Sequence, residues 1–282
     1  MKATTLPFKY LGVHIHKGVT RMGHCKDLLQ AFDNKLNSWG QKMLSQGGRL
    51  ILIKHVLGSI PLHILAVTGI PQTVKSMLNK KISNFFWGFK DNRPKQHWIS
   101  FKKMCRPTES GGVGIRSFDQ SQQVSALKLW WEFQVGQSNW AFLMRNKYGR
   151  RTLGEAKSVD SPTWKTICQI SVKAEAMVDR GDSSIKWKHT SEGVFSSKSA
   201  YKAITQEGRG NLTYTSIWHR KQVPKIKVFL WRLWHKGLPF PGTNCQILCG
   251  IPISLSSLQI RLSYSGPCAS YLSDSSHNLE FL

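Results

Sequence analysis

Apolar side chains recur at steps of three and four residues over much of this chain, which predicts a protein built mainly from helices. A first helix is predicted from Asp27, with an apolar stripe at Leu29, Phe32, Leu36, Trp39 and Met43. The pair Gly47-Gly48 is expected to break it. A second helix is expected to begin near Arg49 and to be kinked or ended by Pro61, whose ring interrupts helical hydrogen bonding.

Two more helices follow from the same periodicity. Pro71 suits the first turn of a helix that is ended by Gly88 and Arg93-Pro94, with Lys75 and Lys80 away from its apolar face. That face comprises Val74, Leu78, Ile82, Phe85 and Phe89. Asp119 is able to cap a helix through Phe133 that buries Val124, Leu127 and Trp131. The large aromatic residues expected in the core are Trp39, Phe85, Trp87 and Trp131.

The remaining pattern is mixed. Alternation over residues 8–15 predicts a strand, with turns at Gly18 and Gly23, and an ordinary edge hairpin is the alternative that this segment alone favours. Beyond Gly136 we expect a connector with a short helix at residues 140–143, and Ser161-Pro162 begins a helix ended by Gly181. Residues 185–188 and 193–196 predict a β-hairpin, after which a short helix begins at Lys198. The fold class is therefore mainly α, followed by a small mixed α/β region with a β-hairpin.

Charge points to the class of partner. The chain has 282 residues with 40 Lys and Arg against 15 Asp and Glu, a formal net charge of +25. Self-repulsion of that size disfavours a compact state unless a polyanion offsets it, and nucleic acid is the favoured polyanion. A ribosomal-type basic protein and a merely soluble one stay open. A membrane partner is not expected, because no basic amphipathic run is present and the apolar window 50–70 contains Lys54, His55, Pro61 and His63.

The basic residues of the predicted helices are candidates for phosphate contacts, which give affinity without reading sequence. Any one of them alone is typical of a solvated helix face, but the collective excess is not. The predicted nucleic-acid-binding residues are Lys35, Lys42, Arg49, Lys54, Lys75, Lys80, Lys102, Lys103, Lys225, Lys227 and Arg232.

Patterns for catalysis and metal binding are incomplete. His14 and His16, near His24-Cys25, share a predicted strand face, for which a solvated hairpin is the favoured reading. His235 with Cys245 and Cys249 has no evident fourth ligand for zinc. The acids are dispersed, whereas polymerase and ribonuclease H chemistry need converging carboxylates. We expect no catalytic residue, no cofactor and no bound metal.

Other local motifs exclude further classes. The run Gly111-Gly112-Val113-Gly114 lacks the length and the Lys-Ser/Thr ending of a P-loop and predicts a tight turn. The six cysteines are scattered, and the first residues lack the apolar core of a secretion signal. These features favour a reducing compartment, the nucleus or the cytoplasm.

Several motifs, taken in order, resemble a known family. They are Leu44–Leu57 with Gly47-Gly48-Arg49, Ile60-Pro61, Phe85-Phe86-Trp87-Gly88, His97-Trp98-Ile99, Gly111–Ile115 and Leu127–Trp131. This order and spacing resembles the segment downstream of the polymerase core in plant non-LTR (LINE-type) retrotransposon reverse transcriptases. In that family the segment is the thumb, which grips the template–primer duplex. The resemblance covers about residues 6–253.

A second resemblance follows in the later half. The motifs are Gly181–Trp187, Val194–Tyr201, Trp218, Pro224–Arg232 and Leu238-Pro239. Their order is similar to the zinc-binding region of the same reverse transcriptases, also found in ribonuclease H-like proteins of that family. The resemblance implies a Cys-x-x-Cys pair soon after Leu238-Pro239 and a later His and Cys, which this sequence does not show.

The resemblance implies four regions: the end of a palm-like strand or hairpin at 1–18, a helical thumb-like module at 19–135, a truncated zinc-binding-like region at 136–253, and a divergent, disordered Ser-rich tail at 254–282. The Tyr-Ala-Asp-Asp-type motif of the family's catalytic palm is absent. The expected function is that of a non-catalytic reverse transcriptase fragment that binds RNA or DNA non-specifically. The alternatives are a protein–protein interaction module and the functionless product of a decayed element.

Overall fold

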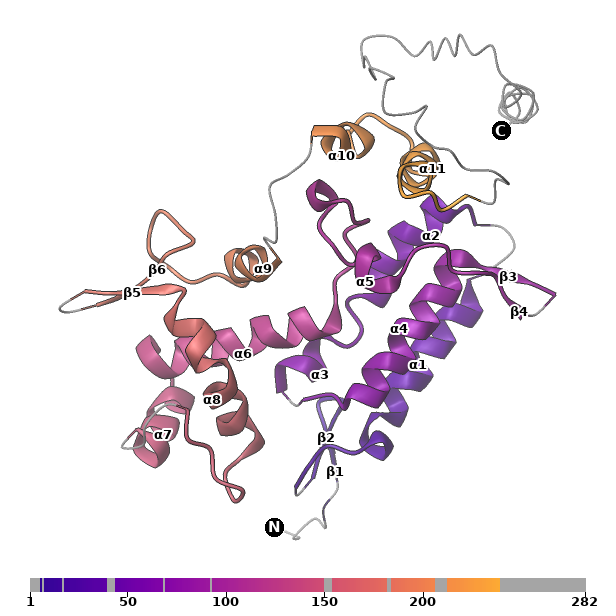
Figure 1. Ribbon diagram of the computed structural model, residues 1–282. Coiled ribbons are helices and arrows are strands. Elements are labelled where there is room, and N and C mark those ends of the chain that lie inside the picture. The colour runs from indigo at the N-terminus through magenta and orange to yellow at the C-terminus, as the bar shows by residue number, and fades with distance from the viewer. Residues whose placement is uncertain are drawn as a thin grey trace, which may run out of the picture. The chain divides into compact units, whose positions relative to one another are not determined.

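The computed structural model describes residues 6, 8–16, 18–39, 44–67, 69–91, 93–149, 154–181, 184–205 and 212–238 (Figure 1). All of them belong to one compact unit, Met1–Thr243. The expected disorder of the Ser-rich tail concerns residues outside this description. No helix in the described ranges combines the length and apolarity that a bilayer crossing requires.

Helices dominate the described residues, which confirms the predicted mainly α class. The α-helices are α1 Lys26–Ser38, α2 Gln46–Leu52, α3 Leu62–Val67, α4 Gln72–Trp87, α5 Phe101–Met104, α6 Phe118–Val135, α7 Asn139–Tyr148, α8 Pro162–Glu175, α9 Ser197–Thr205, α10 Leu212–Ile217 and α11 Pro224–Trp234 (Figure 1). Shorter helical turns are η1 Met22–Cys25, η2 Ile53–Leu57 and η3 Thr108–Ser110. Three antiparallel strand pairs join β1 Phe8–Tyr10 to β2 Val13–Ile15, β3 Phe89–Lys90 to β4 Arg93–Pro94, and β5 Val178–Arg180 to β6 Ile185–Trp187.

Residues 8–15 form a hairpin and not one strand, so of the two alternatives for this segment the structure shows the hairpin. Leu11 and Gly12 turn the chain with φ values of 47° and 81°. Positive φ at both central positions is the geometry of a two-residue hairpin loop, and glycine adopts it without steric cost. Phe8 pairs with Ile15, and Tyr10 pairs with Val13.

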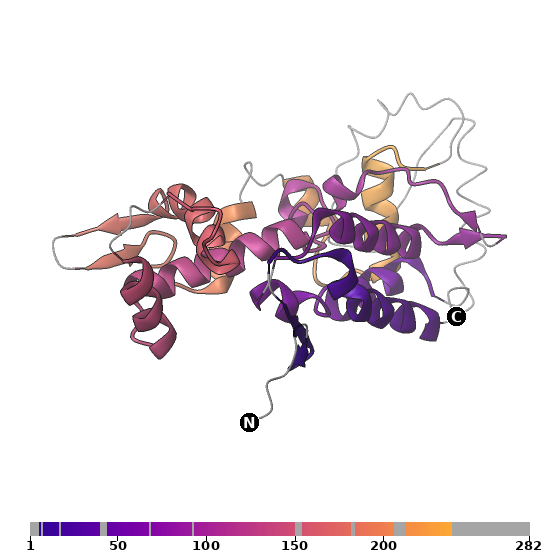
Figure 2. The ribbon, with the colours of Figure 1, turned by 90° about the horizontal axis from the view of Figure 1, so that it is seen from below.

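The first core forms where α1 and α4 lie side by side (Figures 1 and 2). Helix α1 buries Leu28, Phe32 and Leu36, so its stripe begins one residue earlier than predicted. It ends at Ser38, and Trp39 follows in an extended conformation, partly buried against Phe85 with ring centroids 5.6 Å apart. Met43 lies outside the described residues.

The glycine pair does not break a helix, contrary to prediction. Gly47 and Gly48 lie inside the first turn of α2, and the Ser45 hydroxyl accepts a hydrogen bond from the Gly48 N–H at 3.2 Å. Helix α2 then continues into the π-helical turn η2, and the chain turns before Pro61 and begins α3 at Leu62. The glycines are tolerated here because α2 packs against another helix, α11.

Helix α4 buries Val74, Leu78, Ile82 and Phe85 as predicted, and Gly88 with φ 82° ends it. The prediction that Lys75 lies away from the apolar face was wrong. Its side chain is 8% exposed, and its Nζ lies 2.8 Å from the Asp119 carboxylate. The ion pair compensates the buried charge, and it joins α4 to the first turn of α6.

Helix α6 contributes to two cores. Phe118 packs into the first core, whereas Val124, Leu127, Trp130 and Phe133 pack into a second. The predicted burial of Trp131 is only partial, because the fully buried neighbour is Trp130 and the Trp131 ring stacks on Phe195. Ser117, not Asp119, occupies the N-cap position.

The second core collects α7, α8, β5, β6 and α9 around α6. Ser161 caps α8, and Pro162 occupies its first turn, as predicted. The predicted hairpin was placed wrongly, because the strand partner of β6 is the preceding segment 178–180. Residues 193–196 form no strand, although the Trp187 N–H donates a hydrogen bond to the Gly193 carbonyl at 2.8 Å. The later segment instead brings Phe195 against the rings of Trp131 and Trp187.

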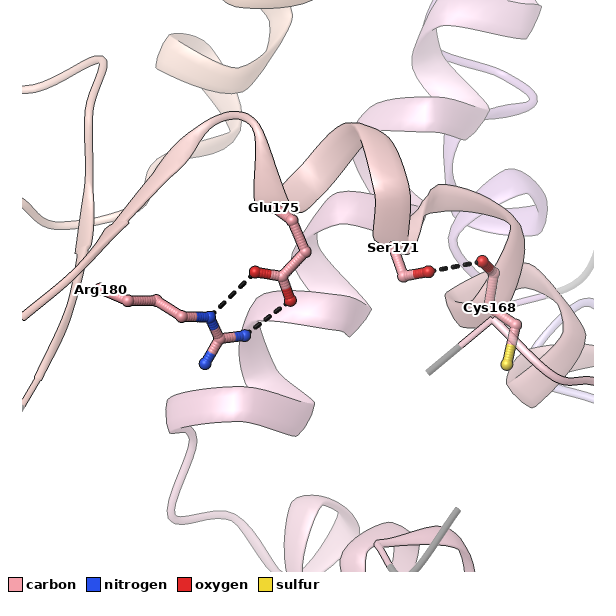
Figure 3. A network of polar contacts seen from close by, with 4 residues as sticks. All are labelled: Cys168, Ser171, Glu175 and Arg180. Atoms are coloured by element: carbon pink, nitrogen blue, oxygen red, sulfur yellow. Dashed lines mark hydrogen bonds and ion pairs between the residues drawn. The ribbon is translucent and has the colours of Figure 1, made fainter. Parts of the chain in front are cut away.

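Helix α8 and the strand that follows it are held by side-chain contacts (Figure 3). The Arg180 guanidinium donates two hydrogen bonds to Glu175, at 2.9 and 2.6 Å, and the Ser171 hydroxyl donates to the Cys168 carbonyl at 2.8 Å. The bidentate pair is exposed, so it orients β5 more than it stabilises the fold.

Candidate nucleic-acid interface

Two long stretches of this chain contain no acidic residue. Residues 34–90 and 208–273 each carry eight Lys and Arg and no Asp or Glu. Local carboxylates would neutralise lysines in place, so an acid-free stretch keeps its positive charge for an external anion except where a distant acid pairs with it, as Asp119 does with Lys75 and Asp33 does with Lys81. The described parts of these stretches include α2, η2 and α4 on one side and α10 and α11 on the other.

The fold brings the two acid-free stretches together. Helix α2 packs against α11 so closely that a Cβ atom on Gly47 would lie 2.6 Å from the backbone of Pro224 and Lys225. The Arg232 guanidinium donates to Gln46 Oε1 at 2.8 Å. Ile217, Val228 and Trp231 of the later stretch are buried in the first core.

The predicted basic residues at this junction fall into two groups. Lys225 is exposed, whereas Lys54 and Lys227 are half-buried and close enough for the charge of Lys227 to lower the pKa of Lys54, after a larger lowering by burial. Arg49 and Arg232 are instead bound internally. Arg49 donates to the Phe85 carbonyl at 3.4 Å, and Arg232 donates twice to the Gly237 carbonyl at 3.1 and 3.0 Å.

The segment around Gly111 is a third part of this junction, and His235 of the later stretch contacts it. The His235 Nε2 lies 2.7 Å from the Gly111 carbonyl, which also accepts a hydrogen bond from Trp231 Nε1 at 2.9 Å. Burial lowers the pKa of His235, the bond to Gly111 opposes this, and the charges of Lys103 and Arg106 lower the pKa further. The predicted residues Lys102 and Lys103 are exposed on α5.

We define the junction surface as seven basic residues: Lys54 of η2, Arg220, Lys221, Lys225 and Lys227 of the α10–α11 segment, and Lys103 and Arg106, whose charges act on His235. Lys35 and Lys80 are exposed elsewhere, on α1 and α4, and Lys75 is paired with Asp119. Lys42 lies outside the described residues. Arg106, Arg220 and Lys221 are not in the predicted list of contacts, and the acid-free stretch around Arg220 and Lys221 is the signal that marks those two.

The described residues do not form a metal centre. The predicted pair was His14 with His16, whereas the structure stacks His16 on His24 with ring centroids 3.9 Å apart. No group of three or more His, Cys, Asp or Glu in the described ranges has the geometry to hold a metal ion. Cys245 and Cys249 lie outside those ranges. His235 does not fit a zinc ligand through Nε2, because that atom is engaged by Gly111.

Comparison with known proteins gives two similarities. Residues 195–246 match the family described as zinc-binding in reverse transcriptase. Over 147 residues, 50% of this chain, the sequence is 29% identical to an Arabidopsis thaliana protein named "Putative ribonuclease H protein". The matched part is 24% of that protein's length, so this chain spans about a quarter of its relative. No solved structure matches the chain.

The two matches support a relation to retrotransposon-type proteins. The family match begins within the segment that packs Phe195 into the second core, and it continues through α9, α10 and α11. Four residues of the junction surface therefore lie in the matched region: Arg220, Lys221, Lys225 and Lys227.

Proposed function

We propose that this chain is a nucleic-acid-holding part of a LINE-type reverse transcriptase, which binds RNA or DNA without sequence preference and performs no polymerase chemistry itself. The supporting observation is the packing of two acid-free, lysine-bearing stretches against each other at α2 and α11. Under this proposal residues 19–135 act as the thumb-like module and residues 136–253 as the zinc-binding-like region. A nuclear or cytoplasmic location fits this role.

The proposal follows from the charge arrangement. Four ion pairs are seen among the described residues, and none of them includes a residue of the junction surface. Lysine amines are compact point charges that suit phosphate oxygens, and phosphate contacts position a duplex or strand without reading its bases. The proposed binding is therefore electrostatic and independent of sequence.

The salt dependence of binding tests this function. Each phosphate contact contributes about −0.9 to the slope of log affinity against log salt on duplex DNA. The double variant Lys221→Gln/Lys225→Gln, on the junction surface, is expected to flatten the slope by roughly two such contacts. Fluorescence anisotropy with oligonucleotides of unrelated sequence, over a salt series, measures both the slope and the lack of sequence preference.

The matched control removes the same charge elsewhere. Lys198 and Lys202 are exposed on α9, which packs on the second core, so Lys198→Gln/Lys202→Gln loses two charges away from the junction surface. Its slope is expected to stay close to that of the unmodified protein. Equal flattening by both double variants would show that total charge matters and this surface does not. Templated primer extension by the chain in Mg²⁺ would contradict the non-catalytic part of the proposal.

A further inference from the structure

Lys54 lies at an unusual point of the backbone. It belongs to η2, a single π-helical turn over Ile53–Leu57, and such turns are rare and frequently found at functional sites. Its amine lies 5.4 Å from the centroid of the Trp218 ring and near Lys227 of α11. A Cβ atom on Gly114 would lie 3.3 Å from the same amine, so the glycine there leaves the amine room.

The Lys54 amine has no acidic partner among the described residues. It is half-buried, and the charged neighbour that shifts its pKa is another cation, Lys227. Placing a cation away from water costs free energy unless an anion or hydrogen-bond acceptors compensate it. The Trp218 ring face attracts the amine by a cation–π interaction but supplies no hydrogen-bond acceptor.

Trp218 gives a second, independent observation. Its indole Nε1 is buried and has no hydrogen-bond partner in the described structure. Buried donors nearly always have an acceptor, because an unsatisfied donor loses its hydrogen bond to water without a replacement. The Lys54 amine and the Trp218 indole N–H therefore lie close together, and among the described residues both lack an acceptor. Lys54 belongs to one acid-free stretch, and Trp218 and the nearby Lys227 belong to the other.

We propose that Lys54, Trp218 and Lys227 form a discrete site for one phosphate group. A phosphate offers several strong acceptor oxygens and the negative charge that both amines lack, whereas a neutral carbonyl would leave the two amines uncompensated. The inference rests on the proposed function in one respect: if the chain binds nucleic acid, a phosphodiester group of that nucleic acid is one source of the phosphate. A free phosphate or nucleotide is the other.

Calorimetric titration with inorganic phosphate, at constant ionic strength set by chloride, tests the site directly. The unmodified chain is expected to bind one phosphate saturably, and Lys54→Met is expected to weaken this about tenfold or more, as loss of a charge-assisted hydrogen bond predicts. Lys202→Met, an exposed lysine of α9 away from the junction surface, should leave phosphate binding unchanged. Circular dichroism verifies folding, and Lys227→Gln gives a second variant if Lys54→Met does not fold.

An oligonucleotide titration of the same variants separates the two sources. Weakening of both ligands by Lys54→Met would assign the site to a phosphodiester, and weakening of inorganic phosphate alone would assign it to a free phosphate group. Absence of saturable phosphate binding, or equal binding by the unmodified chain and both variants, would overturn the site. Nucleic-acid binding with the expected salt slope would in that case leave the proposed function standing.

Discussion

At the residue scale, two adjacent glycines of α2 have different surroundings. A Cβ atom on Gly47 would lie 2.6 Å from the Pro224–Lys225 backbone and 2.8 Å from the Pro224 carbonyl oxygen. A Cβ atom on Gly48 would meet only side-chain atoms of Leu44 and Ser45 at 3.7 Å, which is ordinary contact. The first glycine is therefore required by helix packing, whereas the second is not.

Substitution of each glycine by alanine tests this difference. Gly47→Ala is expected to destabilise the fold by about 1–3 kcal/mol, the usual cost of overpacking against a backbone that must shift. Gly48→Ala should be neutral or should stabilise by up to about 1 kcal/mol, because alanine favours the helix. Urea unfolding of both variants decides the matter. Similar free energies of unfolding for the two would show that α11 does not pack on α2 in this way.

Cys105 is the residue whose environment gives a pH-dependent expectation. Burial, with a smaller contribution from Asp119, raises the pKa of its thiol to about 12. The folded state therefore keeps the proton that the unfolded state loses near pH 9. Its contribution to stability is fully present below the unfolded pKa and is lost as pH rises from about 9 to about 12.

Thiol alkylation measures this protonation state. Only the thiolate reacts, so Cys105 in the folded chain is expected to resist iodoacetamide at a pH of about 8.5. In denaturant it should react at the rate of an ordinary cysteine. Peptide-resolved mass spectrometry follows each cysteine separately. The free energy of unfolding of Cys105→Ala should also fall less steeply above pH 9 than that of the unmodified chain. Rapid alkylation of folded Cys105 would contradict its burial.

At the element scale, hydrophobic periodicity predicted where the four longest helices of the described residues lie, but it misplaced by one residue some of the side chains that they bury. The helices at α1, α4, α6 and α8 follow from apolar steps of three and four. The errors of one residue, Leu28 for Leu29 and Trp130 for Trp131, arise because both neighbours are apolar and the partner element decides which is fully buried. Sequence spacing alone does not contain that choice.

The glycine-bearing elements could not be predicted from local rules. Gly47 and Gly48 look like a break because glycine disfavours helix interiors, yet contact with α11, more than 170 positions later, favours the helix there. The hairpin β5–β6 was misplaced for a similar reason. Phe195 has strand propensity, but its ring is needed between Trp131 and Trp187.

The sequence predicted which basic residues are candidates for phosphate contacts, but not which of them lie on one surface. Lysine count identified Lys54, Lys225 and Lys227, and the fold joins them. The same count also selected Lys75, which lies beside Asp119 only because α4 meets α6. Tertiary structure decides whether a lysine pairs with a distant carboxylate. A prediction from sequence can therefore select a lysine, such as Lys75, whose charge is already paired within the protein.

At the scale of the whole molecule, excess positive charge opposes folding. The chain has 40 cationic side chains and 15 acids, and ion pairs among the described residues involve four of those acids. Like charges at this density repel, and they repel less when salt shortens the screening length to about 10 Å at 0.1 M. Simple salt and nucleic acid are thus expected to stabilise the folded chain by different mechanisms: salt screens the repulsion, and nucleic acid binds.

Thermal unfolding across a salt series, with and without an oligonucleotide, separates these routes. Without oligonucleotide, Tm is expected to rise with NaCl and then level off as repulsion is screened. At low salt, an oligonucleotide at one hundred times its Kd should add about 2.7 kcal/mol of stability, because it binds the folded state preferentially. Added NaCl should remove that increment, since salt weakens phosphate contacts steeply. The two Tm curves should therefore converge at high salt. Parallel curves would mean that the bound strand is held by contacts other than charge, and a Tm that falls with NaCl would show that charge repulsion does not limit this fold.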